Sequence, residues 1–172
     1  MTTKRAACYP QALVVGYGNY SRRDDGVGVR VASRFRERAG KFPLDPESDG
    51  MDELGDSPHV ICVHQLTPEL SELLSEHDLV IFVDAHMGDV FPEPIRIVSV
   101  EAKASAGFAS HIISPGTLVA MTGAIYGRMP QAYLVSVRGH DFDFGDDLSS
   151  ETQALVEEAV EHVWSLIFEA QP

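Results

Sequence analysis

Short apolar runs alternate along the chain with longer segments in which apolar residues recur every three to four positions. The runs 12–15, 60–63 and 79–83 are typical of buried strands, and 79–83 is the most apolar of them, which favours a central place in a sheet. The runs 95–100 and 132–137 complete the predicted strands. Because 95–100 alternates in part between apolar and polar residues, we expect it nearer an edge of the sheet.

Four other segments have the periodicity of helices that are buried along one face. Their apolar positions are, in chain order, Val27, Val31 and Phe35; Leu70, Leu73 and Leu74; Leu118, Met121 and Ile125; and Val156, Val160, Val163 and Ile167. The residues that favour helix ends are Thr67 with Pro68 before the second helix, Ser114 with Pro115 before the third, Gly127 after the third, and Ser150 with Gln153 as a capping box for the fourth. Strands that alternate with helices predict a single α/β domain over 1–172, with a mostly parallel sheet covered on both faces.

One segment, 40–58, breaks this pattern. It contains three Pro, three Gly and six acidic residues, and it has almost no apolar periodicity. Since it is longer than most connections in compact domains, we predict a mobile surface excursion, with a lid that contacts a partner as the alternative.

Composition narrows the classes of partner and compartment. The 172 residues include 26 Asp and Glu but only 13 Lys and Arg, so the formal net charge is -13. Such an acidic chain is poorly suited to bind nucleic acid or an anionic membrane. Apolar runs such as 79–83 are far shorter than the ~20 residues of a membrane helix, and 12–15 is too short for a signal-peptide core. Cys8 and Cys62 form no disulfide framework, so we expect a cytoplasmic protein with no membrane or nucleic-acid partner.

Candidate functional residues follow the predicted strands, at the carboxyl ends where open α/β sheets form their sites. The loop 16–28 follows the first strand and contains Asp24 and Asp25 at the start of a predicted helix. Its first two glycines resemble a dinucleotide-binding fingerprint, but Ser21 occupies the position of the required third glycine. The glycines therefore indicate a tight turn, and the two acids are candidates for helix caps or metal ligands.

A further acid, Asp84, ends the most apolar strand, and His111 lies shortly before the third helix. A carboxylate at the tip of a buried strand costs free energy unless it is paired, solvated or metal-bound. Together with one of the two acids Asp24 and Asp25, these residues form an oxygen and nitrogen ligand set that suits divalent zinc, nickel, cobalt or manganese. Spacing alone leaves His86 and His140 as alternative ligands. The sequence contains no GxSxG, P-loop or HExxH motif.

The segment 15–28, with the sequence VGYGNYSRRDDGVG, closely resembles the opening motif of the hydrogenase maturation proteases. These endopeptidases trim the C-terminal extension from the large subunit of nickel–iron hydrogenases. Further segments that resemble the family follow in the same order, namely 65–70, Asp84 with Ala85, and 110–115. The resemblance extends from about Leu13 to the last helix.

This resemblance implies a five-stranded twisted sheet between helices, and it implies a role for three residues. The family's metal-binding acids correspond to Asp25 and Asp84 and its histidine to His111, while Asp24 stays an alternative to Asp25. The three residues are then expected to contact nickel that the precursor brings, with other divalent metals able to substitute. A peptide bond near the precursor's C-terminus is hydrolysed, with water activated either by the metal or by a carboxylate base. The alternative function is a non-catalytic metal-loading or scaffolding accessory for hydrogenase assembly.

Overall fold

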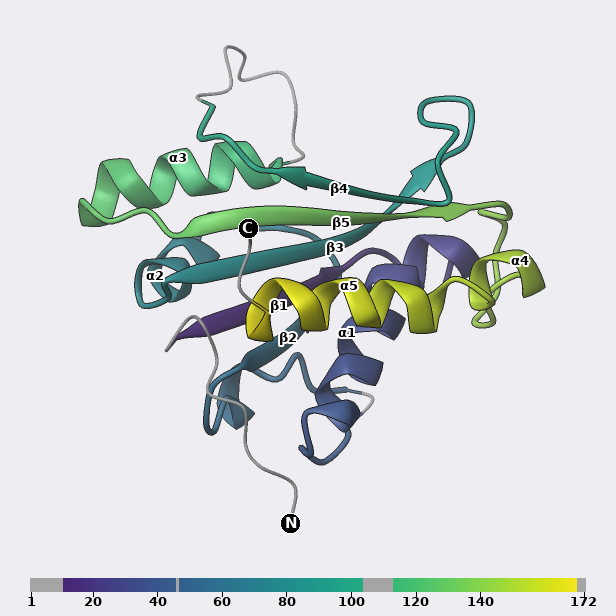
Figure 1. The fold of residues 1–172 in the computed structure, drawn as a ribbon, viewed down its shortest axis with the longest axis horizontal. Helices are drawn as coiled ribbons and strands as arrows, with labels where there is room; N and C mark the ends of the chain where they lie inside the picture. Colours follow the sequence, from purple (N-terminus) through teal and green to yellow (C-terminus); the bar gives the residue numbers. More distant parts are fainter. Residues whose placement is uncertain (1–10, 46, 104–112, 170–172) are drawn as a thin grey trace.

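The computed structural model describes residues 11–45, 47–103 and 113–169, and within them one five-stranded sheet lies between two layers of helices (Figure 1). The strands are β1 (Ala12–Tyr17), β2 (His59–Val63), β3 (Leu79–Met87), β4 (Ile95–Ser99) and β5 (Gln131–Gly139). They lie in the order β2-β1-β3-β5-β4, and only the pair β4 and β5 is antiparallel. This confirms a mostly parallel sheet with 79–83 at its centre and 95–100 at its edge.

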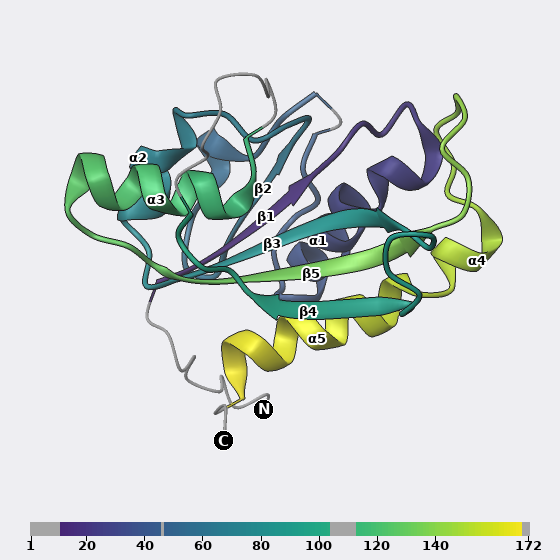
Figure 2. The ribbon, with the colours of Figure 1, turned by 90° about the horizontal axis from the view of Figure 1, so that it is seen from above.

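The helices cover both faces of the sheet, as predicted. They are α1 (Val27–Arg38), α2 (Leu70–Ser75), α3 (Pro115–Tyr126), α4 (Ser150–Gln153) and α5 (Val156–Phe168), with short 3-10 helices η1 (Arg23–Gly26) and η2 (Met51–Glu53). Helices α1 and α5 pack together on one face, while α2 and α3 pack together on the other (Figure 2). The predicted ends of α3 are confirmed, because the Ser114 side chain accepts a hydrogen bond from the Thr117 N–H and Gly127 ends the helix with φ 68°.

Three details of the predicted helices are wrong. Helix α2 begins only at Leu70, after a turn in which the Leu70 N–H donates to the Thr67 carbonyl. The last helical segment is divided into α4 and α5, and Ser149 caps α4 in place of Ser150 because its hydroxyl accepts the Thr152 N–H. Ile125, expected on a buried face, is 61% exposed since it lies in the last turn of α3, beyond the sheet-covering part of the helix.

Strand residues alternate between two apolar cores. Val14 and Ile81 pack under α1 and α5, whereas Val15 and Phe82 pack under α2 and α3. Tyr17 continues the second set, since alternate residues of a strand share a face. The same alternation decides on which face of the sheet each polar residue at a strand end lies.

The first turn of α1 lies unusually close to β1 and β3, and glycines make this possible. A Cβ on Gly16 would lie 2.4 Å from the carbonyl oxygen of Gly28, and a Cβ on Gly28 would lie 2.2 Å from that of Val83. The predicted tight turn with positive φ occurs at Gly18, with φ 136°. The loop after β1 is thus held directly against the end of β3.

The segment 40–58 is tied to the domain at several points. Arg36, which is buried, donates from Nε to the Phe42 carbonyl at 2.7 Å, and the Cys62 N–H donates to the Asp49 carbonyl at 2.8 Å. Residues Met51–Glu53 form η2. Cys62 itself packs against the apolar core, as its place in a strand predicted.

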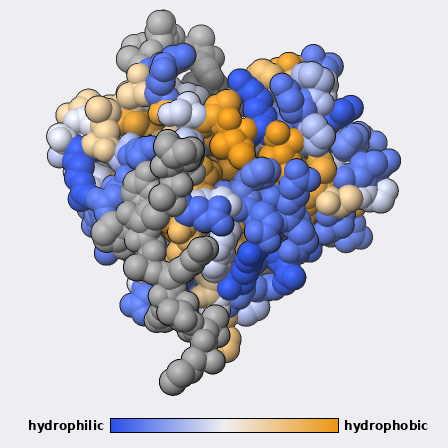
Figure 3. Space-filling view, in the orientation of Figure 1, coloured by the Kyte–Doolittle hydropathy of each residue, from blue (hydrophilic) through white to orange (hydrophobic). Residues whose placement is uncertain are grey.

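The surface in Figure 3 is mostly hydrophilic, with apolar residues gathered over β4 and β5. Ile97 of β4 is 39% exposed, because it belongs to the edge strand. None of the helices in the described ranges has the length and apolar character needed to cross a membrane.

Candidate active site at the ends of β1 and β3

Two of the predicted acids lie at the point where the chain changes direction across the sheet. From β1 the chain passes through α1 to β2 on one side, and it then returns through α2 to β3 on the other side of β1. In open α/β sheets, ligands bind in the crevice at the carboxyl ends of two such strands. Asp25 follows β1 in η1, and Asp84 lies in β3 just after Val83, which is paired with Gly16.

Asp84 is an acid whose environment favours its neutral form. Burial is the main cause, and the negative charge of Asp25 adds to it. Hydrogen bonds from the Ala85 N–H, at 2.7 Å, and from the Tyr17 hydroxyl oppose the effect. The pKa of Asp84 is raised to about 6 as a result, so its carboxyl group titrates close to neutral pH.

Tyr17 was not singled out from the sequence, yet it contacts the predicted site. Burial, together with the charge of Asp84 and the hydrogen bond to it, raises the pKa of Tyr17 well above its usual value. The phenol therefore stays protonated and donates to Asp84. The available signal was its position directly after Gly16 in the loop motif, but the strand register was needed to connect it with Asp84.

Asp25 is half-buried and is held by the loop that precedes it. Its Oδ2 accepts the Asn19 N–H at 2.8 Å. Gly18 makes this loop conformation possible, because a Cβ there would lie only 2.0 Å from the Asp25 carbonyl oxygen. The Asp25 carboxylate keeps its other oxygen, Oδ1, without a hydrogen bond from the described residues, and that oxygen is available to a cation.

Asp24, the alternative to Asp25, has a different role. Its side chain is fully buried and accepts hydrogen bonds from five donors in the described part of the chain, at 2.7–2.8 Å. The donors are the backbone N–H groups of His140, Asp141 and Ser149 and the hydroxyls of Ser149 and Thr152. Burial alone would raise the pKa of Asp24, but these hydrogen bonds outweigh it and lower the pKa to about 2. Asp24 is thus occupied in joining η1 to the loop after β5.

Two of the three histidines considered as ligands, His86 and His140, lie among the described residues. Both ring nitrogens of buried His86 are engaged, Nδ1 with the Ser136 hydroxyl at 2.7 Å and Nε2 with the Glu93 carbonyl at 2.9 Å. Nδ1 of His140 lies 3.0 Å from the Thr152 hydroxyl. His111 lies outside the described residues. Among residues 11–45, 47–103 and 113–169, no group of three or more His, Cys, Asp or Glu side chains is arranged to hold a metal ion.

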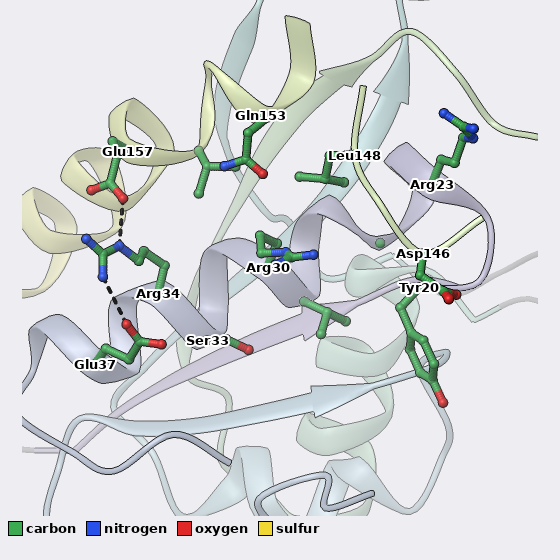
Figure 4. Close-up of a pocket in the computed structure, with 13 residues that line it drawn as sticks. Tyr20, Arg23, Arg30, Ser33, Arg34, Glu37, Asp146, Leu148, Gln153 and Glu157 are labelled. Carbon is green, nitrogen blue, oxygen red and sulfur yellow. Dashed lines mark hydrogen bonds and ion pairs between the residues drawn. The ribbon is translucent and has the colours of Figure 1, made fainter. Parts of the chain in front are cut away.

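The groove beside α1 is separate from this site. It has a volume of about 640 Å³, lies between α1 and the segment from Asp146 to α5, and is lined by neither Asp25 nor Asp84 (Figure 4). Arg34 spans its far end through ion pairs to Glu37 at 2.9 Å and Glu157 at 2.6 Å. Tyr17 and Asp84 belong to the opposite face, under which α2 and α3 pack, so the groove does not serve the acids.

Comparison with solved structures identifies the fold. The sequence matches no protein-family model and no curated protein. The hydrogenase maturating endopeptidase HybD from E. coli superimposes with a TM-score of 0.64 at 22% identity, over 91% of each chain. The fold is that of the hydrogenase maturation proteases.

Two structures from Thermococcus kodakarensis agree with this assignment. The NiFe hydrogenase maturation protease HybD from Thermococcus kodakarensis gives a TM-score of 0.58 at 22% identity, over 91% of this chain and 98% of that one. The maturation protease HycI from Thermococcus kodakarensis KOD1 gives 0.61 at 19% identity, over 91% of both chains. The likeness therefore spans nearly the whole length of these proteins.

Proposed function

We propose that this protein is an endopeptidase that removes the C-terminal extension of a nickel–iron hydrogenase large-subunit precursor. The observation that carries the proposal is the meeting of Asp25 and Asp84 at the carboxyl ends of β1 and β3, within the segment that resembles the family's opening motif. The shared fold supports it. The precursor is the partner, and the reaction belongs in the cytoplasm.

Nickel enters this proposal as part of the substrate. Burial raises the pKa of Asp84 and repulsion from Asp25 adds to it, so a divalent cation that lies between the two carboxylates relieves that repulsion. Asp25, Asp84 and His111 bind the nickel that the precursor already holds, and only a loaded precursor is then fixed in place for cleavage. A preference for nickel over other divalent ions comes from the precursor, because oxygen and nitrogen ligands select weakly among these metals.

Hydrolysis requires a group that removes a proton from water, or a metal that polarises the scissile carbonyl. The carboxylate of Asp84, at the end of β3, suits the first role. The Tyr17 hydroxyl orients that carboxylate through its hydrogen bond. Nickel held by the precursor suits the second role.

The direct test is incubation of the purified protein with nickel-loaded precursor, followed by intact-mass measurement. We expect a precursor shortened at its C-terminus, no product from the nickel-free precursor, and at least a hundredfold slower cleavage by Asp84→Asn and by His111→Ala. Asp78→Asn is the matched control, because Asp78 directly precedes β3, at the opposite end of the strand from Asp84, and its ion pair with Arg128 is at the surface.

One result would correct the mechanism and another would overturn the proposal. Equal cleavage by wild type and Asp84→Asn would remove Asp84 from the mechanism. Binding of the loaded precursor by the wild type without a shortened product would support the non-catalytic accessory instead.

A further inference from the structure

A row of side chains crosses the sheet from the candidate site to the edge strand. Asp84 of β3 is paired with Ser136 of β5, and Ser136 is paired with Arg96 of β4. Directly paired residues of neighbouring strands point to the same face of a sheet. Arg96 therefore lies on the face of Asp84, and two strand spacings of about 4.8 Å place their backbones roughly 10 Å apart.

A second groove, of about 340 Å³, begins at Arg96 and continues on that face between β4 and the start of α3. Its floor is apolar and includes Val98 and Leu134, which are themselves a cross-strand pair. Lys103 and Ser114 line its other end. Unlike the larger groove beside α1, this one is on the same side of the sheet as Tyr17 and Asp84.

The charges of this groove are unusual for so acidic a chain. Arg96 and Lys103 have no ion pair with any described residue, and Glu101 is the one acid among the groove's described lining residues. The guanidinium of Arg96 stacks over the Phe91 ring, 3.9 Å from its centroid. Stacking fixes the plane of the guanidinium and leaves its N–H groups free to bind a carboxylate in a bidentate manner.

We propose that this groove binds an extended segment of the protein substrate, and that Arg96 recognises a carboxylate about three residues from the scissile bond. The inference rests on the proposed function, because it takes Asp84 as the position of the bond that is cleaved. An extended peptide advances about 3.3 Å per residue, so three residues cover the distance from Asp84 to Arg96. Beyond Arg96, the apolar floor receives the next side chains of the segment, and Lys103 adds a second positive charge.

The test is steady-state cleavage of the nickel-loaded precursor by Arg96→Glu and Lys103→Glu. Arg30→Glu is the matched control, because Arg30 is an exposed arginine with no ion pair among the described residues and lies on α1, at the other groove. We expect KM to rise at least tenfold for Arg96→Glu and less for Lys103→Glu, with kcat little changed. The KM of the wild type should rise with salt concentration, and that dependence should be weaker in Arg96→Glu.

A complementary substrate makes the test specific. Precursors in which each acidic residue near the cleavage point is replaced in turn by Lys should be cleaved poorly by the wild type. One of them should regain cleavage with Arg96→Glu, which a structural role of Arg96 does not predict. Unfolding measurements on each variant show that the fold is retained, and Arg96→Gln replaces Arg96→Glu if the latter is unfolded.

The outcomes separate this inference from the proposed function. If the wild type cleaves but Arg96→Glu and Arg96→Gln have the KM of wild type and of Arg30→Glu, the groove proposal is wrong and the endopeptidase proposal stands. If no cleavage occurs, fluorescence anisotropy with labelled precursor decides the groove proposal. Weaker binding by Arg96→Glu than by Arg30→Glu then upholds it, and equal binding overturns it.

Discussion

Asp24 is a buried acid and Asp84 a partly buried acid beside the same loop, yet their surroundings have opposite effects on them. Asp24 accepts hydrogen bonds from a complete set of donors, and its pKa falls to about 2. Burial raises the pKa of Asp84, the charge of Asp25 adds to this, and fewer donors oppose it, so the pKa rises to about 6. The first arrangement stabilises the folded loop, whereas the second holds a carboxylate at a cost in stability. Binding and catalytic sites commonly contain an acid whose pKa is shifted in this way.

The largest expected effect on stability follows from removing the Asp24 side chain. In Asp24→Ala the buried N–H groups of His140, Asp141 and Ser149 lose their acceptor, and we expect a loss of about 3–5 kcal/mol in the free energy of unfolding. Urea denaturation measures it. Asp143→Ala, at an exposed acid of the same loop, should change the value by less than about 0.5 kcal/mol. A loss below 1 kcal/mol for Asp24→Ala would show that the hydrogen bonds do not hold the loop.

Asp84→Asn should have the opposite effect on stability. A pKa raised from 3.8 to about 6 means that the ionised carboxylate disfavours folding at neutral pH, by about 1.4 kcal/mol per pKa unit. We therefore expect this variant to be about 2–3 kcal/mol more stable than wild type at pH 7.5, while it fails to process the precursor. Thermal unfolding at pH 7.5 checks the first part. A less stable variant would contradict the assigned electrostatics.

Asp24 and Asp84 should also differ in the pH range over which they change the stability of the fold. The folded pKa of Asp84 is raised, so the neutral carboxyl group favours folding. This contribution to stability is fully present below pH 4 and is lost as pH rises through 6. The advantage of Asp84→Asn should therefore disappear between pH 7 and pH 4. Because the folded pKa of Asp24 is lowered, its contribution is present above pH 4 and is lost as pH falls toward 2. Unfolding curves from pH 3 to pH 8 test both windows, and an unchanged Asp84→Asn advantage at pH 4 would refute the first.

The smallest effect is expected from Tyr17→Phe. This change removes one hydrogen bond to the Asp84 carboxylate and should raise the pKa of Asp84 further, with a change of about 0.5–1.5 kcal/mol in stability. Carbon-13 NMR of labelled aspartate measures the pKa. An unchanged or lower pKa would mean that the phenol does not donate to Asp84.

Much of the fold was predictable from periodicity, because buried strands and one-sided helices have different spacings of apolar residues. The central strand and the edge strand were placed correctly by how apolar each one is, and the ends of α3 by Ser114 and Gly127. The exposed Ile125 and the cap at Ser149 were missed, since both depend on where a helix ends against the sheet rather than on local preference.

The candidate site was predictable in part. Residue type and position after a strand were enough to make Asp84 and the adjacent pair Asp24 and Asp25 candidates, and the family resemblance favoured Asp25. Adjacent acids look alike in a sequence, so the difference between Asp24 and Asp25 appeared only with the loop after β5, more than 100 residues away. The part played by Tyr17 depends on the register of β1 against β3. The third predicted ligand, His111, stays a prediction.

The central claim is that Asp25 and Asp84 together form one cation-binding position. A crystal of the full chain soaked in nickel or another divalent cation tests it most directly. The account predicts a single ion about 2.0–2.2 Å from a carboxylate oxygen of Asp25 and of Asp84, with His111 as the nitrogen ligand and Asp24 still bound to its five donors. An ion bound to Asp24, or Asp25 and Asp84 each bound to separate ions, would contradict it.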